Sequence, residues 1–121
     1  MSWNREQIDN ILKSNDQAVE RAIIRLFEAQ TDSEQKAAGT HNKNDRGFCA
    51  ADARAGTRFA RMLLGMNDRN QVRYVKKSLS HPTAIRIFSR YCDKGEQPID
   101  RARRIALKHS KQLVDIANGN K

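Results

Sequence analysis

The chain has 121 residues, of which 38% are hydrophobic and 31% charged, and its formal net charge is +9 at pH 7. This length suits a single domain with a modest core, and no apolar run approaches the roughly 18 residues needed to span a membrane. The first residues lack the apolar stretch of a secretory signal, so we expect a cytoplasmic protein without membrane contact.

The charge is distributed unevenly along the chain. Residues 1–45 hold six basic and eight acidic side chains, a net charge of −2, whereas residues 46–121 hold 17 basic and six acidic ones, a net charge of +11. Such asymmetry indicates that one region meets a polyanion while the other packs or faces a different partner. We therefore treat residues 1–121 as one helical domain with an acidic half, 1–45, and a basic half, 46–121.

Two amphipathic helices are expected at the start of the acidic half. Residues 4–13 repeat apolar side chains at helical spacing, and Trp3 is positioned to fold back on them. Ser14 precedes Gln17 by three residues, the arrangement of an N-terminal capping box, and should open the second helix. The positions of that helix expected to be buried are Val19, Ala22, Ile23, Leu26 and Phe27.

The acidic half should end in a short helical turn and a loop. Thr31 and Glu34 repeat the capping arrangement, which predicts a further turn through Ala38. Residues 39–47 are polar and aperiodic, as is typical of an exposed loop. A new helix then begins at Phe48 and ends at a glycine, Gly65. Its expected apolar face consists of Phe48, Ala51, Ala55, Phe59, Met62 and Leu63.

Three more helices are predicted after Gly65. Asp68 can cap the first, which continues to Ser80, and the pair His81-Pro82 starts the next because proline is tolerated only in a first helical turn. Residues 93–97 form a loop, and Pro98–Ala117 is expected to be one continuous helix. No alternating strand pattern occurs, so the predicted fold class is all-α, an irregular bundle of five to seven helices.

Basic side chains recur beside the apolar face of each expected helix after Phe48. In the last helix four of them form a row about 15 Å long at 1.5 Å per residue, suited to following a phosphate strand. Acidic partners at i+4 spacing are scarce, which favours a binding surface over a merely solvated face. The candidate nucleic-acid-binding residues are Arg54, Arg58, Arg61, Arg69, Arg73, Lys76, Lys77, Arg101, Arg104, Lys108 and Lys111.

The expected partner is the phosphate backbone of DNA or RNA, recognised largely without regard to sequence. Tyr74 is the one aromatic residue placed to stack on a base, because the others fall on apolar faces. A helix-turn-helix within residues 68–92, with Arg86 and Arg90 on its second helix, is a weaker alternative. A different function, a modulator that inhibits a host or defence complex by binding protein, would use the same charge.

Catalysis is not expected, and neither is a cofactor. The three histidines lie in a polar loop (His41), at a helix start (His81) and on an apolar face (His109), with no nucleophile or carboxylate pair ordered around them. His41, Asp45 and Asp52 could hold a metal for nuclease chemistry only as a minor alternative. Cys49 and Cys92 lack the close spacing of zinc ligands or an extracellular context, so we expect free thiols.

Three stretches resemble a small helical module of phage and prophage proteins, found alone or attached to phage helicase-like proteins. They are Glu20-Arg21-Ala22-Ile23 with Gln30-Thr31-x-x-Glu34-Gln35, Gly47-Phe48-x-x-x-Asp52-Ala53, and Ala102-Arg103-x-Ile105-x-x-Lys108-x-x-x-Gln112-Leu113. In that module the second and third stretches are joined by a short link, whereas here residues 65–97 intervene. The resemblance implies a phage accessory protein acting in DNA metabolism or host takeover, and it brings no catalytic residues.

Overall fold

The computed structural model describes residues 3–37, 48, 52–67, 69 and 71–119, and of residues 30–37 only the helical backbone. Within this part of the chain the only β-pairing is an isolated bridge between Met66 and Val72, so the predicted all-α fold is confirmed. The elements are α1 (Arg5–Ser14), α2 (Asp16–Ala37), α3 (Ala53–Leu64), α4 (Pro82–Phe88), the 3-10 helix η1 (Ser89–Tyr91), α5 (Pro98–Lys108) and α6 (Ser110–Ala117).

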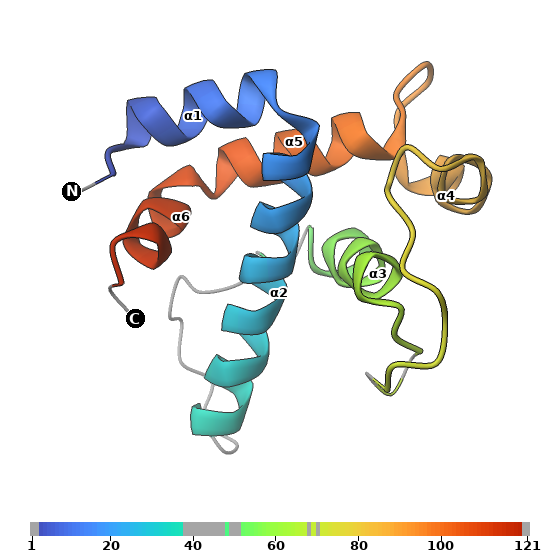
Figure 1. Ribbon diagram of the computed structural model, residues 1–121, viewed down its shortest axis with the longest axis horizontal. Helices are drawn as coiled ribbons and strands as arrows, with labels where there is room; N and C mark the ends of the chain where they lie inside the picture. The colour runs from blue at the N-terminus through green and yellow to red at the C-terminus, as the bar shows by residue number, and fades with distance from the viewer. Residues whose placement is uncertain (1–2, 38–47, 49–51, 68, 70, 120–121) are drawn as a thin grey trace.

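Helix α2 is the centre of the packing. It crosses α5 and contacts α3, while α1 and α6 lie side by side and α4 lies at the opposite end of the molecule (Figure 1). The core draws side chains from both the acidic and the basic half of the chain, because each helix has one apolar face. Its fully buried members include Val19, Ile23, Leu26, Phe59, Leu79 and Ile105.

The first residues are tied to the last helix. The backbone N–H of Trp3 donates to Asn118 Oδ1 at 2.7 Å, and Asn118 Nδ2 donates to the Trp3 carbonyl at 3.0 Å. The Trp3 residue itself is 41% exposed, so the expectation that it folds into the core is wrong. Its backbone makes the contact instead.

Asparagines cap the starts of both α1 and α2. Asn4 and Gln7 form the capping box of α1, and Asn15 Oδ1 accepts from Ala18 N–H at the start of α2. The prediction that Ser14 caps the second helix is therefore wrong by one residue. Asn15 is the cap, and the Ser14 hydroxyl donates to the Asn10 carbonyl instead. Helix α2 also runs through Thr31 without a new start, because nothing there breaks the backbone ladder.

Helix α3 starts later than predicted and ends where predicted. Phe48 lies outside any helix, although it is buried, and α3 begins at Ala53. At its end Gly65 adopts φ 70°, a left-handed conformation that glycine allows at little cost. The exposed loop expected at residues 39–47 lies outside the described residues.

The helix predicted between Asp68 and Ser80 is wrong. The chain turns at Asn67, whose Oδ1 accepts from the backbone N–H groups of Arg69 and Gln71, and residues 71–78 then run without helical structure. We call residues 71–78 the strap. A helix there would have aligned Arg69, Arg73 and Lys77 at i, i+4 spacing, and such like-charge pairs are destabilising.

The strap is held by backbone contacts to its neighbours. The Gly65 carbonyl accepts from the N–H groups of both Arg73 and Tyr74, and the Met62 carbonyl accepts from that of Lys77. Beyond the strap, the N–H of the buried Leu79 donates to Glu20 Oε2 at 2.8 Å. These long-range partners stabilise an extended course between α3 and α4 (Figure 1).

The two proline-marked helix starts are confirmed. His81 caps α4, with Nδ1 accepting from Thr83 N–H at 3.0 Å and Pro82 in the first turn, and Pro98 opens α5 after a turn at residues 93–97. The helix-turn-helix alternative is wrong, because residues 69 and 71–80, which precede α4, contain no helix.

The last helix is not continuous. His109 has φ −105° and ψ 21°, outside helical values, and separates α5 from α6. Its ring Nδ1 lies 2.8 Å from the Ile105 carbonyl oxygen, and its backbone N–H is shared between the Ile105 and Ala106 carbonyls. The side chain thus competes for helical acceptors. The resulting change of direction lets α6 pack along α1 (Figure 1).

Candidate nucleic-acid interface

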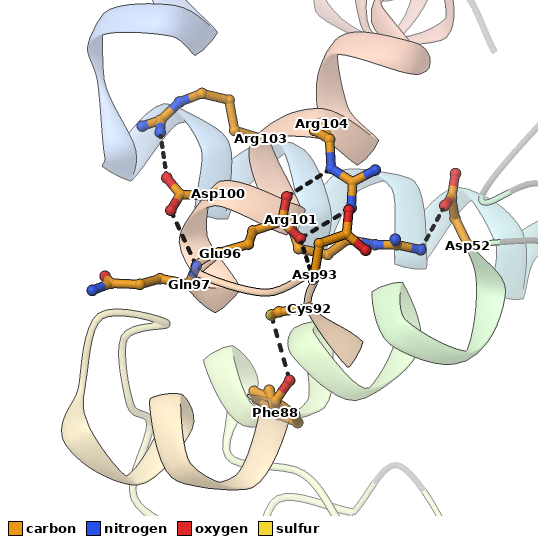
Figure 2. A network of polar contacts seen from close by, with 10 residues as sticks. All are labelled: Asp52, Phe88, Cys92, Asp93, Glu96, Gln97, Asp100, Arg101, Arg103 and Arg104. Carbon is orange, nitrogen blue, oxygen red and sulfur yellow. Dashed lines mark hydrogen bonds and ion pairs between the residues drawn. The ribbon is translucent and has the colours of Figure 1, made fainter. Parts of the chain in front are cut away.

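The row of cations predicted on the last helix is largely engaged inside the molecule. Arg101 NH2 lies 3.2 Å from Asp52 Oδ1, and Lys108 Nζ lies 3.3 Å from Asp52 Oδ2. The side chain of Asp52 is only 7% exposed and that of Arg101 20% exposed. Through Arg101 this carboxylate joins the start of α3 to α5 (Figure 2). The two cations together offset its burial.

Arg104 forms a second cluster with the turn before α5. Its Nε and NH2 donate to the two oxygens of Glu96 at 2.8 and 3.0 Å, and NH2 lies 3.4 Å from Asp93 Oδ2 (Figure 2). This forked hydrogen bond holds the pKa of Glu96 below its ordinary value and raises that of Arg104. Arg104 is thus matched to two acidic groups of its own chain.

A sulfhydryl lies beside this cluster. Cys92 Sγ is 3.4 Å from the Phe88 carbonyl oxygen, and Cys92 is a free cysteine (Figure 2). Burial raises the pKa of its thiol, and the nearby Glu96 adds to that effect. A raised pKa keeps the sulfur protonated and unreactive near neutral pH.

Arg103 has a structural role that the sequence did not indicate. Its Nε donates to the Leu12 carbonyl at 2.9 Å, and its NH2 bonds to Asp16, so it ties α5 to the junction of α1 and α2. It also pairs with Asp100 one turn earlier, at 3.5 Å (Figure 2). No local signal identifies such a partner, because Leu12 lies 91 residues away in sequence.

Only Lys111 of the predicted row is exposed without a partner among the described residues. It lies on α6, beyond the break at His109, so it does not continue the line of the α5 cations. The predicted row therefore does not form one rigid set of unpaired cations. Its α5 members are engaged in ion pairs, and the helix changes direction before Lys111.

Helix α3 carries three of the predicted arginines, of which Arg58 approaches η1. Arg54 and Arg58 are exposed, whereas Arg61 is half-buried. The guanidinium carbon of Arg58 lies 6.0 Å from the centre of the Tyr91 ring, and that of Arg90 lies 5.1 Å from it. Two cations thus converge on one ring by cation–π contacts, a grouping that sequence spacing did not reveal.

The strap carries the other predicted cations, and it does so without a helix. Arg73 and Lys76 are exposed, Lys77 is half-buried, and Arg69 is exposed in the turn before them. None of these four makes an ion pair with an acidic side chain in the part of the chain that the structure describes. The strap also exposes apolar side chains, because Val72, Tyr74 and Val75 are 65%, 65% and 77% exposed.

A shallow groove lies between the strap and α2. It has a volume of about 380 Å³ and is lined by Lys76, Lys77 and Ser78 of the strap and by Glu20 and Arg21 of α2, among others. Arg21 belongs to the acidic half, yet the fold places it beside the basic strap. A division of the sequence by charge alone would group Arg21 with the acidic half and not with the strap.

The metal alternatives lack support in the geometry. No three His, Cys, Asp or Glu side chains gather closely enough to hold an ion among the described residues. Asp52, one of the proposed ligands, is instead engaged by Arg101 and Lys108, while His41, Asp45 and Cys49 lie outside that part of the chain.

No helix in the described part of the chain is long and apolar enough to cross a bilayer.

The sequence matches no family model, and comparisons with the curated proteins and the solved structures give no match either. The resemblance to a phage helical module therefore stays a prediction. The candidate interface is therefore defined by the geometry alone. Some cations of this α-helical protein are paired with acidic groups of the same chain, and within the described residues others are not.

Proposed function

We propose that the protein binds nucleic acid through the phosphate backbone, acting as an accessory binding protein and not as an enzyme. The interface is the basic surface, which we define as Arg54, Arg58, Arg69, Arg73, Lys76 and Lys77. The strap, which carries Arg73, Lys76 and Lys77, is attached to α3, since Lys77 N–H bonds to the Met62 carbonyl one turn beyond Arg58. Phage DNA metabolism is the setting that the sequence resemblance implies.

One observation carries this proposal: the fold divides the cations into two groups. Arg101, Arg104 and Lys108 neutralise acidic groups of the same chain, whereas no ion pair involves the basic surface within the described residues. Unpaired, exposed cations gain most from releasing counterions off a phosphate backbone. Their mutual repulsion is also relieved when a polyanion binds.

The experiment is a salt titration with an oligonucleotide of about 20 nucleotides, single-stranded or duplex, followed by fluorescence anisotropy. With about five phosphate contacts, affinity for duplex should fall roughly 500-fold between about 50 and 200 mM salt. The variant Arg73→Gln/Lys76→Gln leaves about three contacts and should reduce that fall to roughly 40-fold. Both side chains are exposed, so the fold should be unaffected.

The matched control removes two charges elsewhere. Lys13→Gln/Arg25→Gln lies on α1 and α2, where both side chains are exposed and Arg25 forms a surface pair with Glu28. This variant should keep the parent's salt dependence. Absence of binding at about 50 mM salt, or equal salt slopes for the two variants, would contradict the proposal.

A second function has one observation in its favour. Val72 and Val75 are exposed on the strap, and apolar side chains beside cations also suit a protein surface that is acidic with apolar pockets. The protein would then modulate a host or defence complex. Binding to an acidic protein, and no binding to oligonucleotides at about 50 mM salt, would favour this function.

A further inference from the structure

We propose that Tyr74 is a stacking platform for an unpaired base, so that the basic surface prefers single-stranded over duplex nucleic acid. The inference rests on the proposed function and names the form of its ligand. It begins with the exposure of the ring. Tyr74 is 65% exposed, whereas Phe27, Phe48, Phe59 and Phe88 are all buried in the core.

The other two exposed or half-buried aromatic residues are placed differently. Tyr91 is half-buried and is covered by the guanidinium groups of Arg58 and Arg90. Trp3 is bonded through its backbone to Asn118 at the far end of the molecule from α4 (Figure 1). Among the described residues, Tyr74 is therefore the aromatic side chain that combines high exposure with a place in the basic surface.

The backbone of Tyr74 is held on both sides while its ring is left accessible. Its N–H donates to the Gly65 carbonyl at 3.0 Å. Its own carbonyl oxygen lies so close to Gly65 that a β-carbon at that position would overlap it. Because the backbone at Tyr74 is already ordered, binding costs little backbone conformational freedom, which favours affinity.

The charges around the ring select a polynucleotide. Arg73 precedes Tyr74 directly, Lys76 and Lys77 follow within three residues, and none is matched by an acidic side chain in the described chain. An exposed aromatic ring with cations before and after it is the arrangement by which proteins hold single strands, with phosphates on the cations and a base on the ring. In a duplex the base faces are already stacked on one another, so they cannot receive the ring, and the cations can contact only the phosphates.

The test compares the affinities for single strands, oligo(dT) and oligo(U) of about 20 nucleotides, with that for a duplex of the same length. Tyr74→Ala should raise the Kd for both single strands about 5- to 100-fold, the range expected for losing one stacked base, and leave duplex binding unchanged. Tyr74→Phe keeps the ring face and should retain the parent's affinity. The salt slope should stay the same in both variants, because no phosphate contact is lost.

Val75→Ala is the matched control, since it trims an even more exposed apolar side chain of the same strap. It should leave all three affinities unchanged. A direct readout comes from Trp3→Phe/Tyr74→Trp, whose single tryptophan fluorescence should be quenched by the single strands and not by the duplex.

The outcomes separate this inference from the proposed function. If binding depends on salt but Tyr74→Ala weakens it equally for single strands and duplex, or leaves it unchanged, the stacking role is overturned. The proposed function still stands in that case. A complete lack of oligonucleotide binding overturns both. Loss of a protein partner in Tyr74→Ala and Val75→Ala alike, without oligonucleotide binding, would instead identify the strap as a protein-docking surface.

Discussion

Replacing Arg101 by methionine should destabilise the fold although Arg101 was predicted as a ligand-binding residue. The guanidinium lies 3.2 Å from a carboxylate of Asp52 that is 7% exposed. Removing one partner of a buried ion pair typically costs about 3–5 kcal/mol. Lys108, which is 57% exposed and lies 3.3 Å from the same carboxylate, can still offset part of the charge. We therefore expect Arg101→Met to lower the free energy of unfolding by about 2–3 kcal/mol.

The magnitude can be isolated by a double-mutant cycle. Asp52→Asn removes the buried charge, so Asp52→Asn/Arg101→Met should recover about 1–2 kcal/mol relative to the sum of the single variants. The buried Nε of Arg101 has no hydrogen-bond partner among the described residues, and methionine removes that cost in the single and the double variant alike, so it does not affect the coupling.

Urea denaturation monitored by circular dichroism measures these free energies. Arg54→Met is the control, since Arg54 is exposed on α3 and forms no ion pair with the described residues, and it should change stability by less than about 0.5 kcal/mol. If Arg101→Met is as stable as Arg54→Met, or the cycle shows no coupling, the ion pair does not join α3 to α5.

Two further predictions concern the strap and the turn before α5. Gly65→Ala should cost about 2–3 kcal/mol and displace the strap, because the left-handed φ of 70° and overlap with the Tyr74 carbonyl both disfavour a β-carbon. Gly95→Ala, also at positive φ but with nothing within 4 Å of the added carbon, should cost only about 1 kcal/mol in the same denaturation assay. The pKa of Glu96 is held below its ordinary 4.5 by Arg104, so this pair stabilises the protein above that pH. The contribution of this pair disappears as the pH falls through the lowered pKa of Glu96. Glu96→Gln should therefore be less stable than the parent at pH 7 and nearly as stable below that pKa. A constant difference in stability at all pH values would refute this linkage.

The ion pairs of α5 also change how binding can be tested. Charge reversal at Arg104 or Lys108 would place a new carboxylate beside Glu96 or Asp52, so a loss of binding could follow from a disturbed fold. Neutral substitutions in the strap avoid this, because neither Arg73 nor Lys76 forms an ion pair with an acidic side chain in the described chain. The interface is therefore best probed away from the last two helices.

Local chemistry in the sequence was enough to predict the fold class and several helix ends. Gly65, Pro82 and Pro98 mark boundaries through the backbone angles they allow, which depend on the residue and not on distant partners. Apolar spacing likewise identified buried positions such as Phe59 and Ile105. In the strap the β-branched and aromatic Val72, Tyr74 and Val75 favour extended structure, in competition with their helical spacing.

Tertiary structure alone decided which cations are paired and which face solvent. Arg101 and Asp52 are 49 residues apart, and Glu20 accepts from Leu79 across 59 residues, so neither contact has a local signature. Periodicity places a side chain on a helix face, but it does not say which element packs against that face. For this reason the predicted site loses its α5 cations and keeps those of α3 and the strap: charge is a property of the sequence, whereas its compensation depends on residues brought together only by folding.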